Sequence, residues 1–261
     1  LLTLKNILRY AFSFVVIYFA LLSFSPVKSL ITYIHPHEYD PLFAKIDHFV
    51  HFGKYPHEYL SFILNSPYII QWFDIFYTTW FFYIYAYLVW VMFQPEYTKG
   101  RMQLIAAFCL SWTILGNFVA VAAASVGPVF WEFYYDIPSP YIPLLTALEN
   151  ANAVVPLIQI DIADWLLGLQ YDDKMVNVNG PSAMPSLHVG IAALIMLHSW
   201  SYNKILFAFT GLYCLMTLVG SVVLAWHYAI DGYVAIILVY LVWKFAGWIE
   251  SHFSHPQQTS S

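Results

Sequence analysis

Long apolar runs separated by short polar connections dominate the pattern of this chain. A helix that crosses a bilayer needs about 20 mainly apolar residues. Runs of about this length cover residues 10–27, 75–95, 102–125, 185–203, 205–227 and 231–249. The pattern therefore predicts an all-α, polytopic membrane bundle of about six transmembrane helices.

The first run permits two interpretations. It contains no charged residue and follows Lys5 and Arg9, which is also the pattern of a secretory signal peptide. Because no small-residue cleavage site follows the run, we expect an uncleaved transmembrane helix.

Residues 28–74 interrupt the apolar pattern and are predicted to contribute interfacial helices on the outer face. Apolar residues recur at helical spacing between Leu42 and Phe52, which indicates an amphipathic helix in the membrane interface. Residues 59–73 are apolar but contain Asn65-Ser66-Pro67, so we expect a re-entrant or surface helix there.

Residues 126–184 form the second long interruption, which is rich in Pro, Asn and Asp. We expect an outer loop with a short amphipathic helix near residues 157–168. The chain then divides into N-terminal spans with their insertion (residues 1–101), a core of four runs (102–250) and a disordered tail (251–261).

Composition agrees with a membrane protein, because 61% of the residues are hydrophobic and 10% are charged, against about 45–50% and about 25% in soluble domains. The net charge of −5 and the lack of a basic patch exclude nucleic acid as a partner. Basic residues in short connections mark the cytoplasmic side; they are Lys5, Arg9, Lys99, Arg101, Lys204 and Lys244. The two long acidic segments then lie on the periplasmic or lumenal face, in a bacterial inner membrane or a eukaryotic secretory membrane.

The segment Pro181-Ser-Ala-Met-Pro-Ser-Leu-His188 opens the fourth apolar run. Ser186 is a favourable N-cap, and the free N–H groups of a helix that begins there form an anion site that suits phosphate. His188, in the first turn, would lie beside such an anion and can donate a proton to a leaving oxygen. The alternative is an interfacial histidine that only caps the helix.

The segment His227-Tyr-Ala-Ile-Asp231 precedes the sixth run. A spacing of four residues places His227 and Asp231 on one face of a helical turn. A carboxylate that accepts from one imidazole nitrogen fixes the tautomer and leaves the other nitrogen free as a nucleophile or base. A structural pair that satisfies itself at a membrane boundary is the alternative.

These two segments are predicted to meet. The short turn Ser201-Tyr-Asn-Lys204 joins the fourth and fifth runs. Two helices of about 30 Å each then return the chain to the membrane face from which it started. We therefore expect both histidines on one face, as in a phosphoryl-transfer site at a membrane surface.

The motif Pro-Ser-x-His followed by His-x-x-x-Asp resembles that of the type 2 phosphatidic acid phosphatase superfamily. The form Ala-Met-Pro-Ser-Leu-His-Val resembles its inositol phosphorylceramide synthase branch, the inositolphosphotransferases. The resemblance covers residues 102–249, which marks the core of four runs as the catalytic core. It implies that His227, oriented by Asp231, is the nucleophile and forms a phosphohistidine. It also implies that His188 protonates the leaving group and that Ser186 hydrogen-bonds the phosphate.

Departures from the family pattern bear on the substrate. The family has Ser-Arg before the nucleophilic histidine, with five residues between, where this chain has Gly220 and Ser221, and no Arg follows Arg101. Positioned cations stabilise the transfer of a doubly charged phosphate monoester, whereas a phosphodiester carries one charge and needs less. The departures therefore favour a lipid phosphodiester donor. Lys174 is the one cation on the loop before the first motif, and it either binds the phosphate or is a solvated loop charge.

The sequence thus predicts an integral membrane enzyme that transfers a phosphoryl or phospho-headgroup from a phospholipid or polyprenyl phosphate donor to an alcohol acceptor. A lipid phosphate phosphatase of the same fold is the first alternative, and a non-catalytic transport or structural membrane protein is the second. We expect no cofactor and no metal, because the clusters Asp47-His48-x-x-His51 and His57-Glu58 complete no zinc signature. No sequence signal points to a particular oligomeric state.

Overall fold

The computed structural model of the chain is helical and contains no strand among the residues that it describes, which are 15, 18, 34, 36–94, 100–171 and 182–253. The expected first span falls outside the described residues, apart from two isolated positions. Lys174 also lies outside them. The last helix extends to Phe253, and most of the predicted tail at 251–261 lies outside the described residues.

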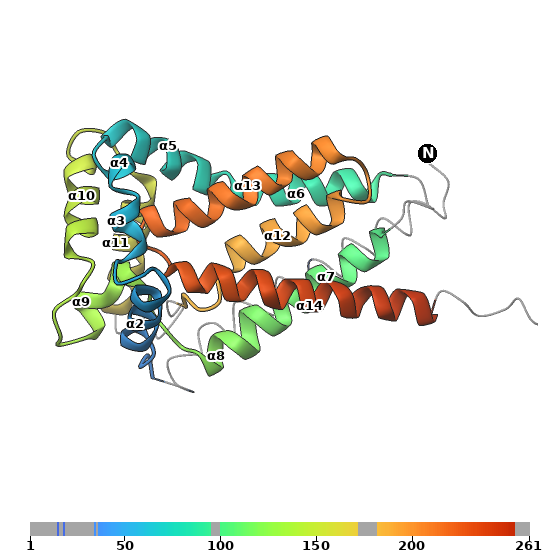
Figure 1. Cartoon of the computed structure of the whole chain (residues 1–261), viewed down its shortest axis with the longest axis horizontal. Coiled ribbons are helices and arrows are strands. Elements are labelled where there is room, and N and C mark those ends of the chain that lie inside the picture. The colour runs from blue at the N-terminus through green and yellow to red at the C-terminus, as the bar shows by residue number, and fades with distance from the viewer. Residues whose placement is uncertain are drawn as a thin grey trace, which may run out of the picture.

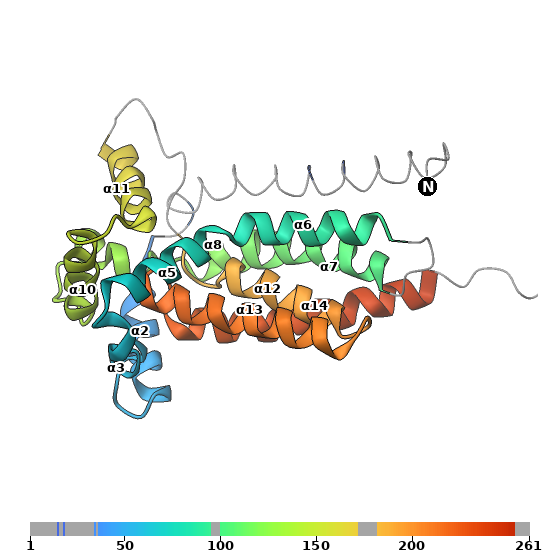
Figure 2. The ribbon, with the colours of Figure 1, turned by 90° about the horizontal axis from the view of Figure 1, so that it is seen from above.

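Four helices in the described part of the chain are long and apolar enough to cross a membrane. They comprise α5 with α6 (Pro67–Thr78 and Trp80–Met92), α7 with its continuation (Arg101–Thr113, the π-helix η1 at Ile114–Val119 and α8 at Ala120–Ala122), α13 (Lys204–Val223) and α14 (Ala229–Phe253). The third, fifth and sixth predicted spans are thereby confirmed. Figures 1 and 2 show these helices running side by side along the long axis of the molecule.

The second span begins earlier than predicted, at Pro67 instead of residue 75. Proline has a fixed φ suited to the first helical position and lacks an N–H that would be unpaired there anyway. Asn65-Ser66-Pro67 therefore starts a long helix and does not break one. The expectation of a re-entrant or surface helix over residues 59–73 is wrong for its second half, which belongs to the span. Short helices α3 (Pro56–Tyr59) and α4 (Ser61–Leu64) precede the span.

Helix α12 (Leu187–Ser199) lies at the centre of the bundle. It packs against α6, α7, α13 and α14, and Gly190 and Ile191 are among its fully buried residues. Its 13 residues are fewer than the predicted span at 185–203, and they extend about 20 Å at 1.5 Å per residue. A helix enclosed by protein need not reach both membrane surfaces, because its ends can be covered by other backbone and side chains.

The remaining helices gather at one end of the bundle, at the left of Figure 1. They are α2 (Asp40–Val50), α3, α4, the 3-10 turn η2 (Pro128–Phe130), α9 (Trp131–Tyr134), α10 (Ile142–Asn152) and α11 (Ile158–Tyr171). The helices expected after Leu42 and near residues 157–168 are confirmed as helices, whereas the sequence pattern did not indicate α10. This group surrounds the beginnings of α12 and α14, where both histidine motifs lie.

Candidate active site

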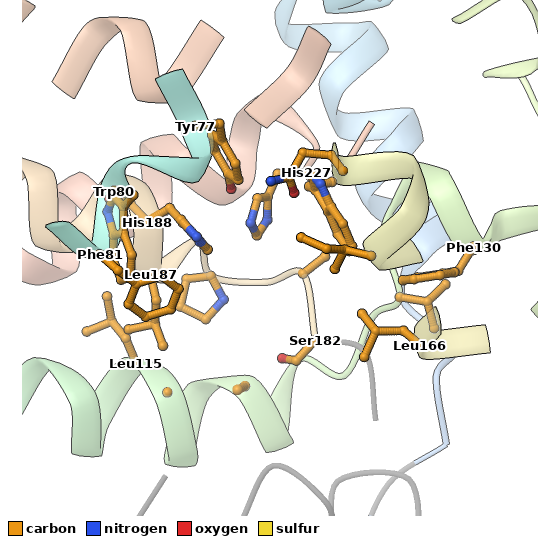
Figure 3. Close-up of a pocket in the computed structure, with 18 of the residues that line it drawn as sticks. Tyr77, Trp80, Phe81, Leu115, Phe130, Leu166, Ser182, Leu187, His188 and His227 are labelled. Atoms are coloured by element: carbon orange, nitrogen blue, oxygen red, sulfur yellow. The ribbon is translucent and has the colours of Figure 1, made fainter. Parts of the chain in front are cut away.

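A cavity of about 360 Å³ lies at the end of the bundle at which α12 and α14 begin. Its wall is mainly aromatic and aliphatic, and η1, α11 and the loop before α14 contribute to it. No Lys, Arg, Asp or Glu lies among its described lining residues, whereas His188 and His227 both do. The two histidines share this space in Figure 3.

The side chain of His188 is held in the first turn of α12 by an aromatic pocket. Its ring stacks on Tyr77 with 4.6 Å between ring centroids and lies 4.2 Å from the ring of Trp80. The indole N–H of Trp80 also donates to the His188 carbonyl oxygen at 2.9 Å. These contacts from α5 and α6 fix the direction of the imidazole toward the cavity.

Ser186 caps the same helix, as the sequence predicts. Its Oγ accepts a hydrogen bond from the Val189 N–H at 3.4 Å, and the residue is fully buried. The hydroxyl does not belong to the described cavity wall, whereas Ser182, Ala183 and Pro185 of the same loop do. The observed geometry therefore supports the capping role of Ser186.

His227 and Asp231 form the expected pair. The distance between His227 Nδ1 and Asp231 Oδ2 is 3.2 Å, and the carboxylate is fully buried. The Tyr228 N–H donates to the same Oδ2 at 3.1 Å. With the Nδ1 proton donated to Asp231, Nε2 is the nitrogen that remains available for chemistry in the cavity.

The two motifs are brought together as the sequence predicts. The ring centroids of His188 and His227 lie 6.4 Å apart. A backbone hydrogen bond of 3.2 Å from the Ser186 N–H to the Asp231 carbonyl oxygen ties the start of α12 to the start of α14. The two imidazoles are therefore close enough to act on one phosphoryl group bound in the cavity that both line.

Two buried carboxylates of α2 hold the second motif from outside. Asp47 accepts from the N–H groups of Ala229 and Ile230 at 2.8 and 3.0 Å, and so caps α14. Asp40 accepts from the Tyr228 hydroxyl at 2.8 Å and from the Gly127 N–H at 2.8 Å. Both carboxylates bind residues that follow His227 and so hold the backbone next to it.

Asp47 is buried, although it lies within the helix that the sequence predicts to be amphipathic. Asp47 is 1% exposed, and burial raises the pKa of its carboxyl although its two backbone hydrogen bonds act in the opposite direction. His51, its i+4 neighbour, bonds through Nε2 to the Tyr233 hydroxyl of α14 at 3.0 Å. No group of three or more His, Cys, Asp or Glu suited to a metal occurs in the described part of the chain.

Asp74 caps a helix of the cavity wall, as Asp47 caps α14. It is fully buried in α5 and accepts from the N–H groups of Ile158 and Gln159 at 2.9 and 2.8 Å. These are the first free N–H groups of α11, and Gln159 lines the cavity. The carboxylate thus stabilises the N-terminus of α11 from a neighbouring helix.

Sequence reasoning missed the part of the site that α5 and α6 supply. Tyr77, Trp80 and Phe81 line the cavity around His188, although more than a hundred residues separate them from it. The only signal was an aromatic run, which is typical of any membrane interface. It carries no information about which histidine the rings will meet.

Comparison with known families identifies the family of the segment that carries both histidine motifs. A family model described as the PAP2 superfamily matches residues 42–245, a segment that contains both histidine motifs and begins inside the insertion at residues 28–74. No curated protein and no solved structure shows a significant match to the chain. The helices, the cavity and the match over most of the sequence lead to one conclusion: the chain is an integral membrane protein of the PAP2 superfamily, a family in general of phosphatase-type and phosphotransferase-type lipid enzymes.

Proposed function

We propose that this protein is a lipid phosphotransferase whose His227 forms a covalent phosphohistidine. The observation that carries the proposal is the placement of His188 and His227 on one cavity, 6.4 Å apart, with Asp231 bound to His227 Nδ1. Covalent catalysis of this kind divides one difficult displacement into two easier ones.

In the first half of the reaction, His227 Nε2 attacks phosphorus and the bond from phosphorus to the leaving lipid oxygen breaks. The His188 imidazolium gives its proton to that oxygen, so that the lipid leaves as an alcohol. Asp231 stabilises the positive charge that develops on His227.

In the second half, neutral His188 removes the proton from the acceptor hydroxyl. The acceptor oxygen attacks phosphorus, the phosphorus–nitrogen bond breaks, and both histidines return to their starting states. The apolar wall of the cavity favours a lipid acceptor because it excludes water, which would otherwise hydrolyse the intermediate.

The donor that suits this cavity is a phospholipid phosphodiester. Its described lining contains no Lys or Arg that would balance the two charges of a monoester, whereas a diester carries one charge. Ser186 is held as the cap of α12 outside the described cavity wall, which leaves Lys174, on the sequence segment before the first motif, as the cation proposed to bind the single charge of a diester. This combination favours phospho-headgroup transfer of the inositolphosphotransferase type, on the periplasmic or lumenal face.

Product analysis by mass spectrometry tests the proposal. Purified protein is incubated with phospholipids and polyprenyl phosphates as donors, and with ceramide and diacylglycerol as acceptors. We expect a new phosphodiester lipid and the released donor alcohol, with neither formed by His227→Ala. A His188→Ala variant should form the product at least about 100-fold more slowly, since a positioned general acid contributes about 10²–10⁴-fold.

Two other outcomes would overturn the proposal. Free phosphate and a dephosphorylated lipid, formed without any dependence on acceptor, would make the protein a lipid phosphate phosphatase. Transfer that persists in His227→Ala would exclude the phosphohistidine. His252→Ala is a suitable control, because His252 is exposed at the far end of α14.

A further inference from the structure

Two buried hydrogen-bond donors in the cavity wall have no partner within the described part of the chain. They are the hydroxyl of Tyr77 and the indole Nε1 of Trp226. Leaving a buried donor unpaired costs about 1–3 kcal/mol, and native proteins keep few such groups. Two unpaired donors in the wall of one cavity indicate that a bound ligand supplies their hydrogen-bond acceptors.

Their position is next to the reacting groups. The Tyr77 ring lies nearly parallel to the His188 imidazole, with an angle of 19° between the planes. Its hydroxyl end is directed toward His227 in Figure 3. Trp226 precedes His227 in the chain and lines the same cavity. Both residues therefore belong to the wall of the cavity that His188 and His227 share.

We propose that the Tyr77 hydroxyl and the Trp226 indole N–H bind the non-bridging oxygens of the substrate phosphate. This inference rests on the proposed function and specifies its substrate class as a singly charged phosphodiester. Fixed neutral donors stabilise the charge that develops on phosphoryl oxygens in a site from which water is excluded. The two neutral donors would replace the hydrogen bonds that arginine gives the phosphate in the family pattern. They would not add the positive charge that a monoester dianion requires.

The decisive variant is Tyr77→Phe, because it removes one oxygen and keeps the ring that stacks on His188. We expect kcat/KM for the phosphodiester donor to fall about 10²–10³-fold, as when one donor of an oxyanion hole is removed. The thermal midpoint should stay the same or rise, because an unpaired buried hydroxyl is removed. Trp226→Phe should lower kcat/KM in the same direction.

Tyr83→Phe is the matched control. The Tyr83 hydroxyl is also buried without a partner in the described structure, but its ring stacks on Tyr213 at 3.7 Å and lies outside the cavity wall. We expect this variant to keep its activity. Equal activities for wild type, Tyr77→Phe and Tyr83→Phe would overturn the inference, as would a Tyr77→Phe variant whose activity falls only in proportion to its folded fraction.

A binding measurement separates failure of this inference from failure of the proposed function. Dibutyl phosphate, a small singly charged diester, is added to the intact protein and the rise in thermal midpoint is recorded. We expect protection of the wild type and of Tyr83→Phe, and little protection of Tyr77→Phe, even if no transfer is found. Equal protection of all three proteins, or stronger protection by inorganic phosphate, would contradict the inference.

Discussion

The Asp47 carboxylate accepts a 2.8 Å hydrogen bond from the backbone N–H of Ala229, although 182 residues separate them in the chain. Ala229 is the first residue of α14 and lies two positions after His227. A buried acidic group at this place serves as the N-cap that α14 does not supply from its own sequence. Helix α2 is therefore part of the support of the site, which agrees with a family match that begins at residue 42.

Replacement of Asp47 by Asn should destabilise the protein. The amide offers one oxygen to the two N–H groups of Ala229 and Ile230, and it brings its own N–H donors into a buried place. A buried donor left unpaired costs about 1–3 kcal/mol. We expect the thermal midpoint in detergent to fall by roughly 2–10 °C, measured by the loss of soluble monodisperse protein on heating.

Asp136→Asn is the control for this loss, since Asp136 is exposed on the loop between α9 and α10. Its thermal midpoint should match that of the wild type. An Asp47→Asn protein as stable as the wild type would show that the hydrogen bonds to α14 contribute no net stability.

Gly127→Ala should destabilise the protein more than the addition of one methyl group usually does. Gly127 has φ +87° and ψ 165°, a region that is open essentially to glycine alone. A Cβ at this position would also meet the carbonyl oxygen of Trp226, the residue before His227. We expect a destabilisation of at least about 1–3 kcal/mol from the backbone conformation alone, and loss of activity from the displaced His227.

Gly168→Ala provides the comparison. Gly168 lies in helix α11, and a Cβ there would meet nothing within 4 Å. Alanine is favoured over glycine in a helix by about 0.8–1.0 kcal/mol, so this variant should be as stable as the wild type or more so. The difference in thermal midpoint between the two alanine variants measures the cost of the close approach at Gly127.

The sequence pattern identifies the candidate reacting groups but not the residues that support them. Local spacing places His227 beside Asp231, and the antiparallel return of two apolar runs places His188 on the same face. Both relationships depend only on helix geometry. The supports from Asp40, Asp47 and Asp74 are contacts between distant segments. An acidic residue at a helical position is read as solvent-facing unless its partner is known, and no local signal identifies that partner.

The fourth span is predicted too long, at residues 185–203, because its tertiary contacts also leave no local signal in the sequence. Hydropathy reports how apolar a segment is, and α12 is as apolar as a helix that faces lipid. Enclosure by four other helices, which makes 13 residues sufficient, depends on the tertiary arrangement. For Tyr77, the ring is visible in the sequence as part of an aromatic run, but its approach to His188 requires the packing of α5 on α12.

Acid should destabilise the protein in part through His57. This side chain is 4% exposed and lies between the rings of Tyr55 and Tyr141. Burial lowers the pKa of His57 below its ordinary value, although the nearby Glu58 acts in the opposite direction. The folded state thus resists protonation, so its stability is full above the ordinary pKa of about 6.5 and declines as the pH falls below it.

His57→Phe keeps an aromatic ring between the two tyrosines and removes the titrating group. Its thermal midpoint should fall less than that of the wild type between pH 7.5 and pH 5. A group that takes up one proton on unfolding contributes a slope of about 1.4 kcal/mol per pH unit. Identical pH profiles for the two proteins would show that other groups, such as the acidic outer loops, account for the acid sensitivity.

The role of His188 can be separated from mere damage to the site by changing the leaving group. If His188 protonates the departing oxygen, its loss should matter most for a lipid alcohol, which leaves poorly as an alkoxide. We expect His188→Ala to transfer from an alkyl phosphodiester about 10²–10⁴-fold more slowly than the wild type. With a nitrophenyl phosphodiester of similar size, whose leaving group needs no proton, the deficit should shrink to roughly 10-fold or less.

His227→Ala serves as the contrast, because loss of the nucleophile cannot be repaired by a better leaving group. That variant should stay inactive with both donors. The 4.6 Å stack of His188 on Tyr77 raises the competing possibility that His188→Ala only collapses the aromatic pocket. Collapse would slow the alkyl and nitrophenyl donors by the same factor, so the ratio of the two rates in His188→Ala distinguishes proton donation from packing.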